Sequence, residues 1–319
     1  VTFLLLVETA GCTPVLPDNK PTEAAKAVVT AVKLRNPLGR TVIPVAGIAT
    51  GDVSGNGKIN LQYWKTVDEA VGLLSGNDVQ FAVLPITTGV NMVASGVDMS
   101  LVGVHEWKVF YLVAAENSQF DGWKSLVGKT VYAPEGKGST VDVLTRYALS
   151  KENIVPDQDV KFVYAPAQEI IALFKEGKIE YAALPEPFVT QAVSAANGKI
   201  VLDYQDYWSG LNEAKNGIPI AGIFVKNDFL NAHPDETKEV VETLSKSIQW
   251  SNDNTNAAIE ASTKVLPLPA KVMQAAMQRI KFEYISAADA KEEVLAFLKT
   301  IQETYPEGIK KMPDDSFFK

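Results

Sequence analysis

The sequence predicts an α/β protein of two lobes, each built as a mixed β-sheet flanked by helices. Its 319 residues exceed what one typical hydrophobic core holds, which favours about two domains. The composition is that of a folded chain, with 46% hydrophobic and 21% charged residues. A helix-strand pattern also occurs twice along the chain. These three observations together predict two lobes of similar construction.

The repeated pattern covers residues 69–85 and 169–185, which read EAVGLLSGNDVQFAVLP and EIIALFKEGKIEYAALP. Each copy begins as a short amphipathic helix, stops near a glycine and ends as an apolar strand closed by Leu-Pro. A strand precedes each copy, at 58–65 and 160–165, so each is a β-α-β unit. Chance similarity between two such units is the alternative, and it also leaves two α/β lobes.

The other elements follow from apolar runs and helical spacing. Strands are expected, in order, at 42–48, 99–104, 109–115, 129–133, 199–203 and 218–225. A helix is expected at 139–150, and the pattern after residue 225 is helical to the end of the chain.

The chain is expected to pass between the lobes twice, near 114–123 and near 208–220. Lobe 1 then comprises 26–116 and 219–319, and lobe 2 comprises 117–218. Two crossings indicate a hinge rather than a rigid joint.

The first 25 residues are expected to be a signal remnant, a lipobox and a tether. An apolar run at 3–7 is too short to span a bilayer, and it is followed by small residues that end at Cys12. Ala10-Gly11-Cys12 looks like the end of a bacterial lipobox, although Thr9 stands where that pattern usually has Leu. Cys12 is therefore the predicted lipidation site and would hold the protein at a membrane surface. A free cysteine in a terminal tail is the alternative.

Charge and composition argue against several classes of function. The formal net charge of −8 and the lack of clustered Lys and Arg argue against a nucleic-acid partner. Two histidines and one cysteine leave little material for a metal site, and no Gly-x-Ser-x-Gly elbow is present. We therefore expect no catalytic residue, no metal and no cofactor.

The repeat predicts where a ligand would bind, because ligands of open α/β sheets bind beyond the carboxyl ends of the strands. The residues after each Leu-Pro, 86–88 and 186–188, should line opposite walls of one cleft. Thr87 and Thr88 could donate hydrogen bonds to an anion there. Capping of the following helix is the equally weighted alternative.

A glycine-containing turn, PEGKGST at 134–140, lies between a predicted strand and a predicted helix. Gly138 allows close approach of a ligand to the backbone, and Ser139 and Thr140 begin a helix whose free N–H groups favour an anion. The order of residues is not that of a phosphate-binding Walker loop. A plain capped helix is the alternative.

Four larger side chains complete the candidate ligand set. Glu186 could accept a hydrogen bond from an amine or ring N–H, or it could cap the helix beginning at Pro187. Phe188 is a candidate packing surface for a ligand, with a place in the core as its alternative. Trp107 is a candidate stacking surface, and Trp208, just before the return crossing, could cover the ligand.

Three stretches now carry a family resemblance. VYAPEGKGST at 131–140, RYAL at 146–149 and LPEPF at 184–188 resemble the ABC solute-binding family that includes nitrate, taurine, alkanesulfonate and thiamine-pyrimidine binders. The resemblance implies a periplasmic-binding-protein fold of type 2 that closes on a ligand and delivers it to a membrane permease. One stretch departs from the family, because 47–57 is short and Gly-rich where a long helix usually follows the first strand. Contacts from Thr50 or Gly51 are therefore not expected.

The predicted function is that of the extracytoplasmic solute-binding component of an ABC importer. We expect a lipid-anchored monomer that captures a small anionic or zwitterionic organic solute. The alternative is an enzyme of the same fold, of the thiamine-pyrimidine-precursor synthase kind. Such chemistry should need histidine and metal-ligating cysteine, and the sequence offers His105, His233 and Cys12.

Overall fold

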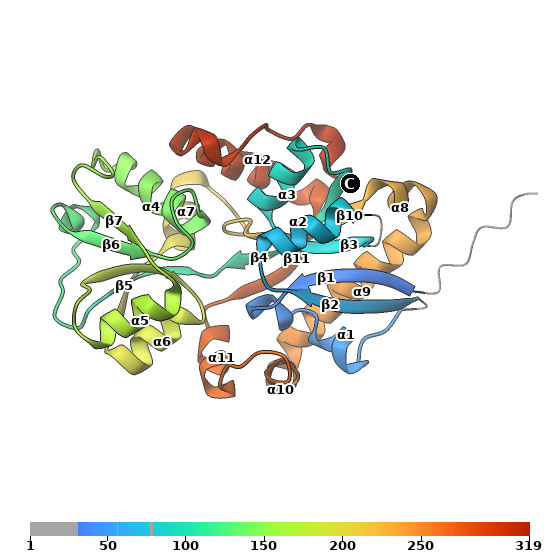
Figure 1. Cartoon of the computed structure of the whole chain (residues 1–319), viewed down its shortest axis with the longest axis horizontal. Helices are drawn as coiled ribbons and strands as arrows, with labels where there is room; N and C mark the ends of the chain where they lie inside the picture. Colours follow the sequence, from blue (N-terminus) through green and yellow to red (C-terminus); the bar gives the residue numbers. More distant parts are fainter. Residues whose placement is uncertain (1–30, 56, 77–78) are drawn as a thin grey trace, which may run out of the picture.

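The computed structural model describes residues 31–55, 57–76 and 79–319 (Figure 1). Cys12 and the predicted tether lie outside the described residues. Within them, the chain forms two β-sheets, each with helices on both faces. The predicted class, two mixed sheets flanked by helices, is confirmed.

The first sheet has the strand order β11-β4-β10-β3-β1-β2. β1 pairs in parallel with β2 and β3, whereas β10 is antiparallel to β3 and β4, and β11 is antiparallel to β4. The strands are β1 (Ala31–Pro37), β2 (Lys58–Trp64), β3 (Phe81–Pro85), β4 (Met99–Lys108), β10 (Ala221–Lys226) and β11 (Lys281–Ser286).

The second sheet has the order β7-β6-β8-β5-β9. β6 pairs in parallel with β7 and β8, and β5 is antiparallel to β8 and β9. The strands are β5 (Phe110–Ala114), β6 (Thr130–Ala133), β7 (Lys161–Tyr164), β8 (Tyr181–Pro185) and β9 (Lys199–Asp203).

Helices cover both faces of each sheet. The first lobe carries α1 (Ala46–Thr50), α2 (Val67–Ser75), α3 (Ile86–Ala94), α8 (Asn227–Ala232), α9 (Pro234–Asp253), α10 (Thr255–Thr263), α11 (Ala270–Met277) and α12 (Ala287–Thr304). The second carries α4 (Thr140–Lys151), α5 (Ala167–Lys175), α6 (Phe188–Ala196) and α7 (Tyr204–Asn212). In the described part of the chain, none of these helices combines the length and apolarity that a membrane crossing requires.

The strands are apolar on both sides because each sheet is covered twice. In β3, Phe81 and Val83 face the cluster that includes Leu244 of α9, whereas Ala82 and Leu84 face the cluster beneath α3 and α12. That second cluster continues into the second lobe beneath α4 and α7. One side of the lobe junction is therefore a continuous apolar core.

The described chain passes between the sheets twice. It leaves the first sheet at Val109, directly between β4 and β5, and returns through the segment between α7 and β10. This second segment, residues 213–220, lies within the stretch 208–220. The first comes earlier than the expected boundary after residue 116, because β5 pairs wholly with the second sheet. A short apolar strand does not reveal from its sequence which sheet it joins.

The two repeat units take equivalent places. β2, α2 and β3 surround β1 as β7, α5 and β8 surround β6. After each Leu-Pro, the next N–H donates to the carbonyl that precedes the neighbouring strand: Ile86 N to Ile220 O at 3.0 Å, and Glu186 N to Val109 O at 2.9 Å. The two repeat units therefore share this backbone hydrogen bond as well.

The predicted strand at 42–48 is wrong, because the first strand is β1 and residues 40–50 form a 3-10 turn followed by α1. Apolar runs of this length suit a buried helix as well as a strand. The Gly-rich stretch at 47–57 begins inside α1, which lasts only five residues and ends at Gly51 in the left-handed conformation.

Candidate functional site

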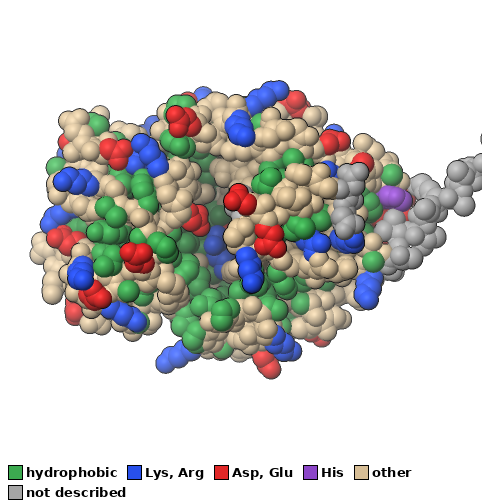
Figure 2. Space-filling view, viewed as in Figure 1, with side chains coloured by type: hydrophobic (Ala, Val, Ile, Leu, Met, Phe, Trp, Pro, Cys, Tyr) green, Lys and Arg blue, Asp and Glu red, His purple; other side chains and the backbone are tan. Residues whose placement is uncertain are grey.

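A cavity of about 560 Å³ lies between the two lobes, within the range of small-molecule sites. Figure 2 shows the surface hollowed between the lobes, with side chains of both charges on its walls. The first lobe contributes the loop after β1 and the ends of β2 and β3, and the second contributes Phe110, Pro185 and residues of the turn before α4. The cavity therefore sits at the carboxyl ends of strands from both sheets, where a ligand site is expected.

The loop that follows β1 is fixed by a buried asparagine. Asn36 is fully buried, and its Nδ2 donates to Pro37 O at 2.9 Å and to Thr41 O at 3.1 Å. Leu38 N donates to Trp64 O at 2.7 Å, which ties the loop to the end of β2. These bonds hold Arg40 at the cavity wall.

Arg40 is the central cation of the cavity. Its Nε donates to Glu106 Oε1 at 2.5 Å and its Nη2 to Glu106 Oε2 at 2.9 Å, a two-point contact with a fully buried carboxylate. Among the described residues, no hydrogen bond is made by Nη1. Burial acts to lower the pKa of Arg40, but Glu106 and, less strongly, Glu135 outweigh it and raise that pKa. Arg40 is thus charged, oriented, and has one nitrogen left for a ligand.

The N-terminus of α3 enters the cavity from the first lobe. Thr87 and Thr88, predicted as ligand-binding, line the cavity and are partly buried. The first N–H of the helix, on Ile86, is used by Ile220 O. Neither threonine hydroxyl makes a hydrogen bond among the described residues, so both can bind a ligand without breaking an internal contact.

The N-terminus of α4 enters the cavity from the second lobe. Gly138, Ser139 and Thr140 of the glycine-containing turn line it. Gly138 has a φ of +85°, and a Cβ there would lie 2.3 Å from the Tyr305 ring, so a side chain is excluded on two grounds. Asp142 Oδ2 accepts from Gly138 N at 2.8 Å and places one negative charge inside this helix terminus.

The rest of the lining is aromatic at the base and charged at the rim. Trp64 and Phe110 are nearly buried lining residues, and the indole N–H of Trp64 has no partner among the described residues. Lys65, Glu135 and Lys137 are exposed lining residues. A ligand here would meet apolar surface below and both signs of charge around it.

Glu186 lies outside the cavity lining. Its Oε2 accepts from Thr190 N at 3.0 Å, the capping arrangement that was the alternative to ligand binding. Its Oε1 accepts from Arg279 Nε at 2.5 Å. The carboxylate is fully buried, so both oxygens are committed within the protein.

The three predicted aromatic residues also lie outside the lining. Trp107 is fully buried and its indole N–H donates to Glu283 O at 2.9 Å. Phe188 packs into the apolar cluster beneath α5 and α6. Trp208 packs against Tyr147 at a tilt and edge-to-face against Phe297, in the core at the lobe junction. In each case the core role is the one that the structure has.

Sequence reasoning missed Arg40 and Trp64. Arg40 is a single basic residue in a loop, and no spacing around it indicates a partner. The Asn-Pro-Leu-Gly stretch at 36–39 is a turn signal that could have marked the end of a first strand, and hence a ligand-facing loop.

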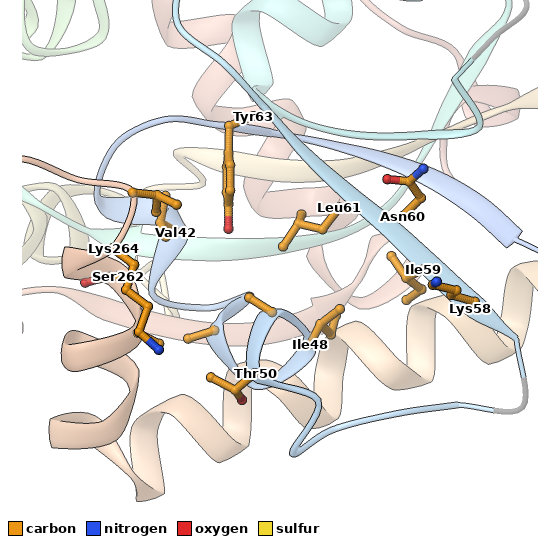
Figure 3. Close-up of a pocket in the computed structure, with 14 residues that line it drawn as sticks. Val42, Ile48, Thr50, Lys58, Ile59, Asn60, Leu61, Tyr63, Ser262 and Lys264 are labelled. Atoms are coloured by element: carbon orange, nitrogen blue, oxygen red, sulfur yellow. The ribbon is translucent and has the colours of Figure 1, made fainter.

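A second cavity, of about 670 Å³, lies on the outer side of the first lobe (Figure 3). It is bounded by α1, the edge strand β2 and the end of α10, and Thr50 is among its lining residues. No residue of the second sheet lines it. A ligand there could not bridge the lobes, so size alone does not identify the site.

The described part of the chain holds no cluster of three or more His, Cys, Asp or Glu side chains arranged to bind an ion. His105, on β4 next to Glu106, is buried against Phe282 with ring centroids 6.4 Å apart. Burial lowers the pKa of His105 to about 4, so its imidazole is neutral at neutral pH.

Two mixed sheets, two crossings and a cleft between lobes define the class of the molecule as a two-lobed periplasmic-binding-protein fold. Residues 56–266 match the model of the NMT1-like family, and the chain belongs to that family. The resemblance to ABC solute-binding proteins is thereby confirmed at the level of family and fold.

Solved structures share this fold. An ABC transporter protein from Parabacteroides distasonis has a TM-score of 0.74 and 23% identity, over 91% of this chain and 99% of that chain. The periplasmic aliphatic sulphonate binding protein SsuA from Escherichia coli has a TM-score of 0.72 and 18% identity, over 91% of each chain.

Curated relatives match over shorter stretches. The nitrate/nitrite binding protein NrtA of a Nostoc species is 24% identical over 119 residues, which is 37% of this chain and 26% of that protein. The bicarbonate transport ATP-binding protein CmpC of Synechococcus elongatus is 27% identical over 115 residues, or 36% of this chain. The chain spans only 16% of the length of CmpC.

Proposed function

We propose that this protein is the solute-binding component of an ABC importer and binds its solute in the cleft between the lobes. The observation that carries the proposal is the convergence of three donor groups from both lobes on one cavity. These are the N-terminus of α3, the N-terminus of α4 and the free Nη1 of Arg40. Relatives of the same fold that bind sulphonates or nitrate support the assignment.

The solute we propose is a small organic anion or zwitterion. The free first-turn N–H groups of α3 and α4 and the free nitrogen of Arg40 can each donate to an anionic oxygen. Asp142 offsets part of the positive end of α4, and Glu106 offsets part of the charge of Arg40. Glu135 at the rim can accept from an amine, and its effect on Arg40 places it near the same space. Trp64 and Phe110 offer apolar contact for a carbon skeleton.

Binding would couple to closure because the donors come from different lobes. A solute held by Thr88 and Thr140 at once favours the arrangement in which both threonines face the same cleft. Moving a two-state equilibrium from almost fully open to almost fully closed takes roughly 5.5 kcal/mol of differential affinity. Several hydrogen bonds to charged groups, at about 1.5–3 kcal/mol each, can supply this.

We also propose an extracytoplasmic location, a monomeric state, an ABC permease as partner and lipidation at Cys12. Fold relatives described as periplasmic support the location. The lipidation proposal rests on the sequence around Cys12 alone. Mass spectrometry of protein from the membrane fraction should show a lipid on Cys12. The Cys12→Ala variant should leave the membrane fraction.

The enzyme alternative finds no chemical support in the cleft. Among the described residues that line it, none is a histidine or a cysteine. Glu106, the buried carboxylate there, has both oxygens occupied by Arg40.

A thermal-shift screen tests the proposed function. Nitrate, taurine, ethanesulfonate, benzoate and thymine would be compared, because ligands that bind the native state raise the melting temperature. We expect the stabilising compounds to be anions or zwitterions, and Arg40→Met to remove the shift. Lys65→Met, which removes an exposed cation at the same rim, is the matched control and should keep most of it. Stabilisation by thymine that survives Arg40→Met would contradict the proposal.

A further inference from the structure

A single arginine of the first lobe holds three groups of the second lobe. Arg279 lies between α11 and β11. Its Nε donates to Glu186 Oε1 at 2.5 Å, and its Nη2 donates to Thr190 Oγ1 at 2.6 Å. Its carbonyl oxygen accepts from the Tyr111 hydroxyl at 2.6 Å. We call these four residues the interlobe latch.

The latch lies on the opposite side of the crossing strands from the apolar contact between the lobes. Figure 1 shows α12 on one side of the crossing strands and α11 on the other. On the α12 side, Phe297 packs edge-to-face on Trp208, with ring centroids 5.8 Å apart. On the α11 side, α11 packs on α6, and Arg279 pairs with Glu186 and donates to Thr190. A rotation of one lobe against the other that keeps Phe297 on Trp208 would therefore separate Arg279 from Glu186.

The chemistry of the latch suits a contact that opens and closes. The Arg279 side chain is 28% exposed, so water can reach the guanidinium when it separates from its partner. Glu186 keeps its hydrogen bond from Thr190 N in either state, because that bond lies within the second lobe. Burial is the main reason that the pKa of Tyr111 is raised, so its hydroxyl stays protonated as a donor. Opening therefore breaks the three contacts of Arg279 but keeps the cap of α6.

We propose that the interlobe latch sets the balance between the arrangement of lobes seen here and a more open one, and so tunes solute affinity. Arg279 and Glu186 are positioning residues, since neither lines the cleft. The effect on affinity rests on the proposed function, but the effect on lobe arrangement does not. Apparent affinity falls in proportion to the population of the binding-competent state.

The test measures the distance between the lobes without any ligand. Nitroxide labels on Lys175→Cys in α5 and Lys246→Cys in α9 report it by pulsed electron resonance, in a full-length Cys12→Ser background. Both label positions are exposed. Arg279→Met should move the distribution to longer distances, with the ratio of open to closed molecules raised about tenfold, the effect of one charge-assisted hydrogen bond.

Two further variants separate the latch from general stability. Glu186→Gln keeps an acceptor for Thr190 N and removes the charge, so it carries the test if Arg279→Met folds poorly. Its combination with Arg279→Met should be no more open than either alone. Lys129→Met breaks the Lys129–Glu180 pair of 2.8 Å inside the second lobe and should leave the distribution unchanged.

The latch proposal would be overturned if folded Arg279→Met and Glu186→Gln both kept the wild-type distance distribution. It would also be overturned if Lys129→Met changed that distribution as much as the latch variants do. Both latch variants could show longer interlobe distances while none of the five screened compounds binds. In that case the proposed function fails, and the proposed role of the latch in lobe arrangement is supported. If taurine or another compound binds, its Kd in Arg279→Met should rise by the factor by which the measured closed fraction falls.

Discussion

Ile86 and Glu186 occupy equivalent positions in the two lobes, but their side chains make different contacts. Each follows a Leu-Pro at a strand end, each is fully buried, and each donates its N–H to the chain at a lobe crossing. Ile86 completes an apolar cluster. Glu186 instead caps α6 and pairs with Arg279 of the other lobe.

This difference shows how one backbone plan supports two tasks. In the first lobe, an apolar anchor leaves the next residues, Thr87 and Thr88, free to face the cleft. In the second lobe, the Glu186 carboxylate contacts the first lobe. The residues of the second lobe that line the cleft come largely from the turn before α4. A repeat predicts equivalent backbones, but the side chain decides the function of each copy.

Exchanging the two side chains should give the largest effect. Ile86→Glu places a carboxylate in an apolar cluster without a designed partner, and should cost about 4 kcal/mol or more of unfolding free energy. Glu186→Ile loses a cap and an ion pair that is partly exposed, and should cost about 2 kcal/mol. Urea denaturation measures both. Equal losses would mean that the two positions are not differentiated as described.

The two Arg–Glu pairs should differ in their effect on solute affinity. Arg40 contacts the cleft, so Arg40→Met should weaken binding about 100-fold, the upper range for a hydrogen bond to a charge. Arg279 acts only through the lobe arrangement, so Arg279→Met should weaken binding by at most about tenfold. Titration calorimetry with the compound that stabilises the protein most would compare them. A larger loss in Arg279→Met would reverse the assignment.

The residues that follow Ile86 and Glu186 should show a smaller contrast. Thr88→Val removes a hydroxyl that faces the cleft and should weaken binding about fivefold, the value of about 1 kcal/mol for one hydrogen bond. Phe188→Leu changes a residue that packs beneath α5 and α6, and should leave affinity unchanged. The same calorimetry applies, and a stronger effect from Phe188→Leu would place the ligand elsewhere.

Much of the fold was predictable because it follows from periodicity. The repeat at 69–85 and 169–185 predicted both β-α-β units, and PEGKGST at 134–140 predicted the start of α4. The sequence does not predict β1, because the charged residues Lys33 and Arg35 alternate with its apolar ones. The run at 42–48 is more apolar and is therefore the one predicted as a strand. Hydrophobicity marks burial more reliably than it marks the type of element.

The candidate site was only half predictable for a related reason. Thr87, Thr88 and the turn at 138–140 follow strand ends, a position that sequence can identify. Arg40 depends on Glu106 in another strand, and Glu186 depends on Arg279, far along the chain. Such long-range partners leave no local pattern, so the ion pair that occupies Glu186 could not be read from its neighbours.

The central claim, that the interlobe cleft holds the solute, is tested most directly by a crystal structure with the stabilising compound from the screen. We predict density between the N-termini of α3 and α4, within hydrogen-bonding distance of Arg40 Nη1 and the Thr88 hydroxyl. Density confined to the outer cavity between α1, β2 and α10 would contradict the account, because a ligand there touches only one lobe.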